Sequence, residues 1–169
     1  YAVVAMQKND PVLYEDALTH INQALSIDGK YHRAFMIKQH LRALLLQDPV
    51  EAIIHDLDAY FIPLLESLEK DKVAGYHLYR GMINLHYDCF DDAIIDYENA
   101  LSNGYDPIVG KLNLAIAKYH TSIAGIPRDQ RILLPSIKMK PMLEAEKILI
   151  DIIRTVKGNP DSVAIMQHA

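Results

Sequence analysis

The amino-acid sequence predicts an all-α fold, organised as a solenoid of helical hairpins. Apolar side chains recur at steps of three and four residues over 13–27 and 90–101, as they do on one face of an amphipathic helix. No stretch of the chain shows the sustained alternation of apolar and polar residues that a half-buried strand requires. The two helical segments also resemble each other, because Tyr14–Ala17 (YEDA) matches Phe90–Ala93 (FDDA). Similarity between helical segments of one chain is typical of a repeat architecture.

The expected helices follow one another along the whole chain. They cover 1–8, 12–27, 31–47, 49–70, 73–87, 90–103, 107–122 and 141–157, with the start of another at 161–168. Pro11 and Pro49 stand at helix starts, where the missing N–H of proline breaks no hydrogen bond. Pro63 is expected to kink or divide the long helix at 49–70. The sequence NPDS at 159–162 indicates a fresh helix start.

Composition limits the class of protein. Half of the 169 residues are apolar and 23% are charged, which is enough apolar sequence for a core and excludes wholesale disorder. The net charge of −5 speaks against nucleic acid and against an anionic membrane surface as partners. No apolar run approaches the roughly 18 residues that span a bilayer, so no membrane insertion is expected. Because the chain begins at Tyr1, we expect it to be part of a longer protein.

The positions of small residues give the repeat its register. Ala5 precedes Ala17 by the same twelve residues by which Gly81 precedes Ala93. In this respect the sequence resembles the tetratricopeptide repeat (TPR) family, whose 34-residue unit is a pair of antiparallel helices, A and B. That unit has a small residue at position 8 of helix A and alanines at positions 20 and 27 of helix B. Small side chains let two helices cross closely.

The resemblance implies four hairpins. Position 8 falls on Ala5, Gln39, Gly81 and Ala115, position 20 on Ala17, Ala52, Ala93 and Ala145, and position 27 on Ala24, Ala59, Ala100 and Ile152. The repeats lie near 1–30, 31–71, 72–106 and 107–160 within a single domain, 1–169, and an irregular insert at 121–140 interrupts the fourth. The second repeat matches poorly, because Gln39 stands at position 8 and Asp56 at position 24, where an apolar residue is expected.

The resemblance also implies a function. Helical pairs of this family stack into a right-handed superhelix whose concave groove is lined by the A helices. The strongest groove candidates are Met36, Ile37, His40, Tyr79, Met82, His86, Asn113 and Tyr119, and Met6, Arg33, Leu85, Ile116 and His120 also fall at groove positions. Methionine and tyrosine suit an adaptable, amphipathic contact surface. We therefore expect a non-enzymatic protein–protein interaction scaffold that binds a peptide or a partner helix. The alternatives are a self-assembly module, giving a homo-oligomer, or a docking or regulatory domain of a larger enzyme.

No motif points to catalysis, a metal or a cofactor. The eight histidines include no pair four residues apart and no HExxH, so we expect surface or groove histidines. The thiol of Cys89 stands beside Asp88 and Asp91, whose charges raise a thiol pKa and argue against a nucleophile. Glycine-rich phosphate loops and the G-x-S-x-G elbow are absent from the sequence.

Two adjacent stretches carry opposite charge. The acids Asp88, Asp91, Asp92, Asp96, Glu98 and Asp106 lie in 81–110, which contains no Lys or Arg, and are expected to form a solvated helix face. The basic residues Arg128, Arg131, Lys138 and Lys140 lie in the insert, close to the apolar run 132–134. Opposite patches steer association. The hypothesis is that residues 128–140 form a second contact surface for an acidic partner or a second copy, the alternative being an insert that folds back on its own repeat.

Overall fold

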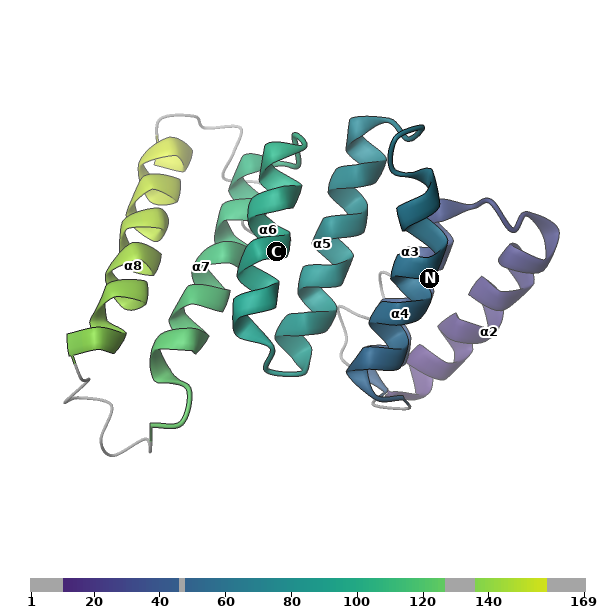
Figure 1. The fold of residues 1–169 in the computed structure, drawn as a ribbon, viewed down its shortest axis with the longest axis horizontal. Helices are drawn as coiled ribbons and strands as arrows, with labels where there is room; N and C mark the ends of the chain where they lie inside the picture. The colour runs from purple at the N-terminus through teal and green to yellow at the C-terminus, as the bar shows by residue number, and fades with distance from the viewer. Residues whose placement is uncertain (1–10, 46–47, 127–135, 158–169) are drawn as a thin grey trace. The chain divides into compact units, whose positions relative to one another are not determined.

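The structure, a computed structural model, describes residues 11–45, 48–126 and 136–157 (Figure 1). In those ranges every regular element is helical and no strand occurs, which confirms the all-α prediction for this part of the chain. The elements are α2 (Pro11–Ile27), α3 (His32–Leu44), α4 (Val50–Phe61), the 3-10 turn η1 (Ile62–Leu64), α5 (Lys70–His86), α6 (Phe90–Ser102), α7 (Pro107–Ile123) and α8 (Ser136–Lys157). The helices expected at 1–8 and 161–168 lie outside the described residues. Among the helices described, none has the length and apolarity to cross a membrane.

Two compact units make up the chain, the first at residues 1–105 and the second at 106–169. In the first unit, α3 packs against α2, α4 and α5, and α5 packs in turn against α4 and α6 (Figure 1). In the second unit, α7 packs against α8. Most of these contacts join helices that follow one another in sequence, and α3 with α5 is the main contact that skips a helix.

An apolar cluster with a small residue near its centre joins α2 to α3. Its buried members are Tyr14, Ala17 and Ile21 of α2, and Ala34, Ile37 and Leu41 of α3. These positions on α2 repeat at steps of three and four, so one face of the helix is apolar along its length. Ala17 is almost completely buried, and its single methyl group leaves α3 room to approach.

The α4 helix turns a different face to the core from the one that the repeat alignment predicts. Its completely buried residues are Ile53, Leu57 and Phe61, which pack among side chains of α3 and α5. Ala52 and Ala59, which the alignment places at inward small-residue positions, are exposed. The alignment is therefore wrong at these two positions, since neither alanine lies at a helix crossing. Asp56, which the alignment places where an apolar residue is expected, lies on the exposed side next to the buried Leu57.

The prediction that Pro63 divides the helix at 49–70 is confirmed. The α4 helix ends at Phe61, and the proline lies in the 3-10 turn η1 that follows it. The next helix, α5, begins at Lys70. Proline has no N–H to donate and its ring crowds the preceding turn, so a regular α-helix stops before it.

The α5 and α6 helices cross closely at Gly81. A Cβ atom placed on Gly81 would lie 2.8 Å from Cε1 of Tyr97 and 3.2 Å from Cβ of Asp96. Side chains essentially never pack at 2.8 Å, so this crossing requires glycine. Ala93 and Ala100 of α6 are completely buried as well. The expectation of a tight crossing at Gly81 is therefore confirmed.

Both helices of this hairpin end in the same backbone turn. Asp88 follows α5 with a φ of 61°, and Gly104 follows α6 with a φ of 87°. In each turn the next amide reaches back over the helix end, from Cys89 N to Asn84 O at 2.9 Å and from Tyr105 N to Ala100 O at 3.0 Å. This is a Schellman motif, in which the residue with positive φ is usually glycine.

In the second unit, polar contacts fix α7 and its pairing with α8. Asp106 caps the start of α7, since its Oδ1 accepts hydrogen bonds from the amides of Ile108 and Val109, both at 2.9 Å. Two ion pairs then join the helices, Lys111 Nζ to Asp151 Oδ2 at 2.7 Å and Lys118 Nζ to Glu144 Oε2 at 2.8 Å. Ala115 of α7 and Ala145 of α8 are buried and line the same pocket between the two helices, and Ile152 of α8 is buried as well.

The α8 helix begins earlier than the sequence predicts. It starts at Ser136 and not at residue 141, so the last part of the expected irregular insert is helical. Pro141 lies inside the helix. Residues 127–135 of the insert lie outside the described residues.

Candidate functional site

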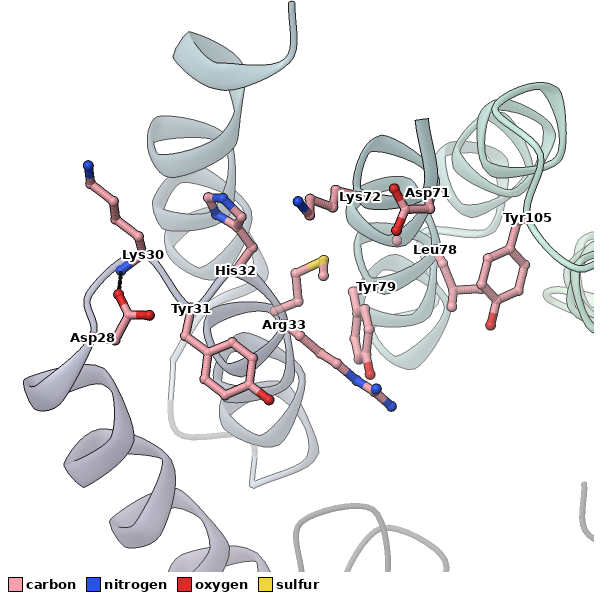
Figure 2. Close-up of a pocket in the computed structure, with 12 residues that line it drawn as sticks. Asp28, Lys30, Tyr31, His32, Arg33, Asp71, Lys72, Leu78, Tyr79 and Tyr105 are labelled. Carbon is pink, nitrogen blue, oxygen red and sulfur yellow. Dashed lines mark hydrogen bonds between the residues drawn. The ribbon is translucent and has the colours of Figure 1, made fainter. Parts of the chain in front are cut away.

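A pocket with a lining of apolar, aromatic and charged side chains lies between α3 and α5 in the first unit. Its volume is about 580 Å³. Its lining residues are Asp28, Lys30, Tyr31, His32, Arg33, Met36, Asp71, Lys72, Gly75, Leu78, Tyr79 and Tyr105, shown in Figure 2. They come from the turn before α3, from the facing surfaces of α3 and α5, and from the turn after α6.

Hydrogen bonds fix the turn between α2 and α3 at the edge of the pocket. Asp28 Oδ1 accepts the amide hydrogen of Lys30 at 2.9 Å, and the hydroxyl of Tyr60 donates to the carbonyl of Gly29 at 3.0 Å. The same hydroxyl lies 3.1 Å from Nδ1 of His32. Tyr60 of α4 therefore ties this turn to the start of α3, so the groups at the edge of the pocket are held in place.

The floor of the pocket is apolar and is open because residue 75 is glycine. Met36 and Leu78 are buried there, on α3 and α5 respectively. A Cβ atom on Gly75 would lie 3.3 Å from the Met36 methyl carbon Cε. A longer side chain at 75 would therefore occupy the pocket itself. The flexible thioether of Met36 can adapt to the shape of an occupant.

Charged groups of both signs surround this floor. Lys30, Arg33 and Lys72 contribute cations, whereas Asp28 and Asp71 contribute carboxylates. Figure 2 shows Arg33 reaching from α3 toward Tyr79 of α5, and Lys72 extending from α5 toward α3. Lys72 also pairs with Glu69 at 3.0 Å, with both groups substantially exposed.

Tyr79 forms one wall of the pocket, and its hydroxyl stays protonated at neutral pH. Burial raises the pKa of this phenol, while the charge of Arg33 and a hydrogen bond with it act in the opposite direction. The wall therefore offers an aromatic face and a hydroxyl that can both donate and accept.

One helical turn further along α3, a buried histidine lies against the same wall. The rings of His40 and Tyr79 meet edge to face with 5.8 Å between their centroids. His40 is 6% exposed, and its Nδ1 has no hydrogen-bond partner among the described residues. Burial, aided by the charge of His86, lowers the pKa of His40 to about 4. The ring is therefore neutral at pH 7.

The groove candidates from the sequence fall in several environments. Met36 and Tyr79 line the pocket, as does Arg33. Ile37 belongs to the α2–α3 core, and His40 is buried beside Tyr79. Met82 and Leu85 are half-buried and His86 is exposed, on later turns of α5. Asn113, Ile116, Tyr119 and His120 lie on α7 in the second unit, and Met6 lies outside the described residues.

Sequence reasoning missed most of the pocket edge. Asp28, Lys30 and Tyr31 belong to a turn, and helix periodicity assigns no direction to turn residues. Lys72 falls at none of the groove positions that the resemblance implies, and Tyr105 follows a helix end. The start of α3 is surrounded by Tyr31 and three charged residues, Asp28, Lys30 and Arg33. Such a group indicates a polar pocket edge, but it does not identify the helix on the other side of the pocket.

A second pocket, of about 530 Å³, lies within the second unit between α7 and α8. Its lining is Ala115, Ile116, Tyr119, His120, Met142, Ala145, Glu146, Leu149 and Ile150. All but three of these side chains are aliphatic or thioether groups, so this surface is far more apolar than the first pocket. Three sequence candidates, Ile116, Tyr119 and His120, contribute to it.

The acidic stretch does not form a single solvated face. Asp96 is 3% exposed, and its carboxylate accepts a hydrogen bond from Asn84 Nδ2 at 2.9 Å. It also lies 3.3 Å from Nδ1 of His77 and 3.7 Å from Nε of Arg80. The sequence expectation is therefore wrong for Asp96. The cation that faces it, Arg80, stands just before the stretch that contains no Lys or Arg.

The candidates for a second contact surface are only partly described. Lys138 and Lys140 lie in the first turns of α8, and Lys140 is exposed. Arg128 and Arg131 lie outside the described residues. Lys111 and Lys118, from the same basic stretch, pair with acids of α8 within the second unit.

The described residues hold no group of three or more His, Cys, Asp or Glu side chains arranged to bind a metal ion. Cys89 is half-buried at the start of α6. Burial raises the pKa of its thiol, and the nearby carboxylates of Asp92, Glu51 and Asp88 raise it further. A thiol in this state is a poor nucleophile at neutral pH.

No protein-family model, curated protein or solved structure matches this chain. The functional argument therefore depends on the residues and their geometry.

Proposed function

We propose that this chain is a non-enzymatic protein-interaction scaffold of the TPR type, which binds a peptide segment in the groove between α3 and α5. The observation that carries the proposal is the pocket at the start of these helices, with its apolar floor and charged edge. The twelve-residue spacing of Gly81 and Ala93, together with their burial at the α5–α6 contact, supports the TPR assignment.

The chemistry of the pocket suits a peptide better than a small polar metabolite. An apolar side chain of the peptide would contact Met36 and Leu78, and Gly75 leaves the space for it. Arg33 and Lys72 extend into the opening from opposite helices, where they meet carboxylates or backbone carbonyls of the same segment. Tyr79 supplies a rigid amphipathic wall, a frequent feature of protein interfaces.

A random 12-residue peptide library displayed on phage tests the proposal. We expect selection on the immobilised chain to enrich peptides that bind in fluorescence polarisation with synthetic copies. Gly75→Leu should fill the floor and weaken their binding at least tenfold, and Arg33→Glu should do the same for peptides that carry an acidic residue. Tenfold corresponds to about 1.4 kcal/mol of binding free energy.

Matched controls separate the pocket from the rest of the surface. Ala52→Leu adds a leucine to the exposed side of α4, and Lys147→Glu reverses an exposed charge on α8. Both should bind the selected peptides as the wild type does. Failure to enrich any peptide, or peptides that tolerate Gly75→Leu, would contradict the proposal.

A further inference from the structure

We propose that Asn103 is a site of spontaneous deamidation and isoaspartate formation, and that the reaction proceeds when the turn at the end of α6 opens locally. Asn103 is the one asparagine of the sequence that glycine, Gly104, follows. Glycine has no Cβ atom, so its amide nitrogen is unhindered and its backbone rotates freely once it is released from a turn. This modification site is separate from the peptide groove proposed above.

The reaction needs water and no other co-reactant, and it releases ammonia. The amide nitrogen of Gly104 loses its proton and forms a bond to Cγ of Asn103. The bond from Cγ to Nδ2 breaks, and Nδ2 leaves as ammonia with the proton that Gly104 gave up. Water then opens the resulting cyclic imide at either carbonyl, which leaves aspartate or isoaspartate at residue 103.

The folded turn holds the reacting atoms apart. Asn103 has a ψ of 10°, so the amide nitrogen of Gly104 nearly eclipses the nitrogen of Asn103 and is turned away from its Cβ atom. Ring closure requires the nitrogen of Gly104 on the same side as Cβ. Because the peptide unit is planar, rotation about this ψ must bring it there. The backbone therefore has to leave the native turn before the ring can close.

Hydrogen bonds keep the turn in this unreactive form. The Gly104 amide, which contains the attacking nitrogen, donates to the carbonyl of Leu101 at 3.0 Å. The Asn103 side chain is held as well, because its Nδ2 donates to the carbonyl of Asn99 at 2.9 Å. Both the attacking N–H and the leaving amide are thus engaged in the folded chain, and opening of the turn must break both bonds.

The turn lies where a helix end can open without the core. Gly104 is exposed, and open space surrounds the position that a Cβ atom would occupy there. Ala100 and Tyr97, earlier on α6, are completely buried. Helix ends open with much smaller free energies than core segments do. We therefore expect the end of α6 to open and admit water while Ala100 and Tyr97 keep their contacts.

Isoaspartate at residue 103 would prevent the turn from re-forming. Its backbone passes through the side-chain carbons and is longer than that of asparagine or aspartate. The amides of Gly104 and Tyr105 are then displaced from the carbonyls of Leu101 and Ala100, which they meet at 3.0 Å in the native turn. Tyr105 lines the pocket between α3 and α5 (Figure 2), so the product also alters the backbone that carries a residue of that lining.

Peptide mapping by mass spectrometry, on the 169-residue chain kept at mildly alkaline pH, tests the chemistry. In urea that unfolds the chain, Asn103 should convert at least tenfold faster than Asn99, the matched control that alanine follows on the same helix. Asn103→Gln should give no product at 103, because its longer side chain does not form this ring at a comparable rate. Equal conversion at Asn103 and Asn99 in urea would overturn the proposal.

The same measurement without urea tests the control by the turn. Wild type should convert at Asn103 at least tenfold more slowly when folded than in urea. Tyr105→Pro has no N–H to donate to the Ala100 carbonyl and leaves the Asn103–Gly104 pair intact. Its ratio of folded rate to rate in urea should be at least fivefold higher than that of wild type, with a helical circular dichroism spectrum.

Urea below the unfolding transition supplies a second measurement on wild type. A local opening exposes little surface, so the conversion rate at Asn103 should stay nearly constant there. A rate that rises in proportion to the unfolded fraction would overturn local opening. A folded chain that converts as fast as the unfolded chain would overturn control by the turn.

Thermal unfolding tests the effect of the product. The isoaspartate form, separated from an aged sample and identified by an isoaspartate-specific methyltransferase, should have a lower Tm than Asn103→Asp. That variant has the same charge as the product and an ordinary backbone, so it isolates the effect of the longer chain path. Equal Tm values would overturn the expectation that isoaspartate breaks the turn.

Discussion

The buried imidazole of His40 makes the stability of the first unit depend on pH. Its pKa is about 4 in the folded chain, whereas an unfolded histidine binds a proton near pH 6.5. Between these values the unfolded state binds more protons, so stabilisation that is complete above pH 6.5 is lost as the pH falls toward 4. We expect wild type to lose about 2–3 kcal/mol more unfolding free energy than His40→Leu over this interval.

Urea unfolding at closely spaced pH values measures this difference. His55→Leu is the control, because the His55 side chain is 81% exposed and should leave the wild-type pH dependence unchanged. Parallel pH profiles for wild type and His40→Leu would show that the ring does not titrate in this way.

The two turns with positive φ predict opposite effects of two small substitutions. Asp88 adopts a backbone conformation that favours glycine, so Asp88→Gly should stabilise the chain by about 0.5–1 kcal/mol. Gly104→Ala introduces a Cβ atom into the same conformation and should cost about 1 kcal/mol. Open space surrounds Gly104, so backbone strain alone accounts for that loss. Thermal unfolding of both variants checks the pair, and a loss of stability in Asp88→Gly would count against this reading of the turn.

At the scale of an element, α5 contains two glycines with opposite requirements. Alanine is favoured over glycine by about 1 kcal/mol in a helix interior. At Gly81 the added Cβ would meet the buried ring of Tyr97 at 2.8 Å, so Gly81→Ala should cost about 1–3 kcal/mol despite that preference. At Gly75 the Cβ would meet only the flexible end of Met36, so Gly75→Ala should be neutral or stabilising. Urea denaturation of the two variants makes the comparison, and equal effects would show that helix propensity alone decides them.

Helix periodicity predicts the elements well where one face is clearly apolar. The α2 and α6 helices fall within a residue of their expected ends, because Tyr14, Ala17 and Ala93 mark an unbroken apolar face. The α4 helix shows where this approach fails. Two alanines on its exposed side, Ala52 and Ala59, mimic the small residues of a crossing, and periodicity alone does not separate them from neighbouring core residues.

The candidate site is less predictable than the helices because it depends on which elements face each other. Met36 and Tyr79 belong to the periodic pattern of α3 and α5, and the sequence identifies both. Lys72 and Tyr105 contribute only because other parts of the first unit fold beside them. The prediction that Asp96 lies on a solvated face is wrong for the same reason, because its partners Asn84 and Arg80 lie on the preceding helix.

At the scale of the whole molecule, the distribution of charge predicts salt-sensitive association. Exposed ion pairs contribute only about 0–1 kcal/mol each to stability. Reversing Arg128, Arg131, Lys138 and Lys140 to Glu should therefore leave Tm nearly unchanged and abolish any association that weakens with salt. Light scattering at low and high salt measures this, with differential scanning calorimetry as the control. Unfolding of the variant would show that the insert is structural.

The labelling rate of the Cys89 thiol carries information on local opening of the chain. Cys89 is the single cysteine of the sequence and lies at the junction of α5 and α6, half-buried, with its Sγ 3.7 Å from the carbonyl of Tyr87. Because the thiol is only half-buried, a thiol-specific reagent reaches it partly in the folded chain and fully once this junction opens. The ratio of its labelling rate to that of an unfolded peptide, corrected for the raised thiol pKa, therefore sets an upper limit on the opening equilibrium of this hairpin. A limit close to the unfolding equilibrium of the whole first unit would show that the hairpin does not open on its own.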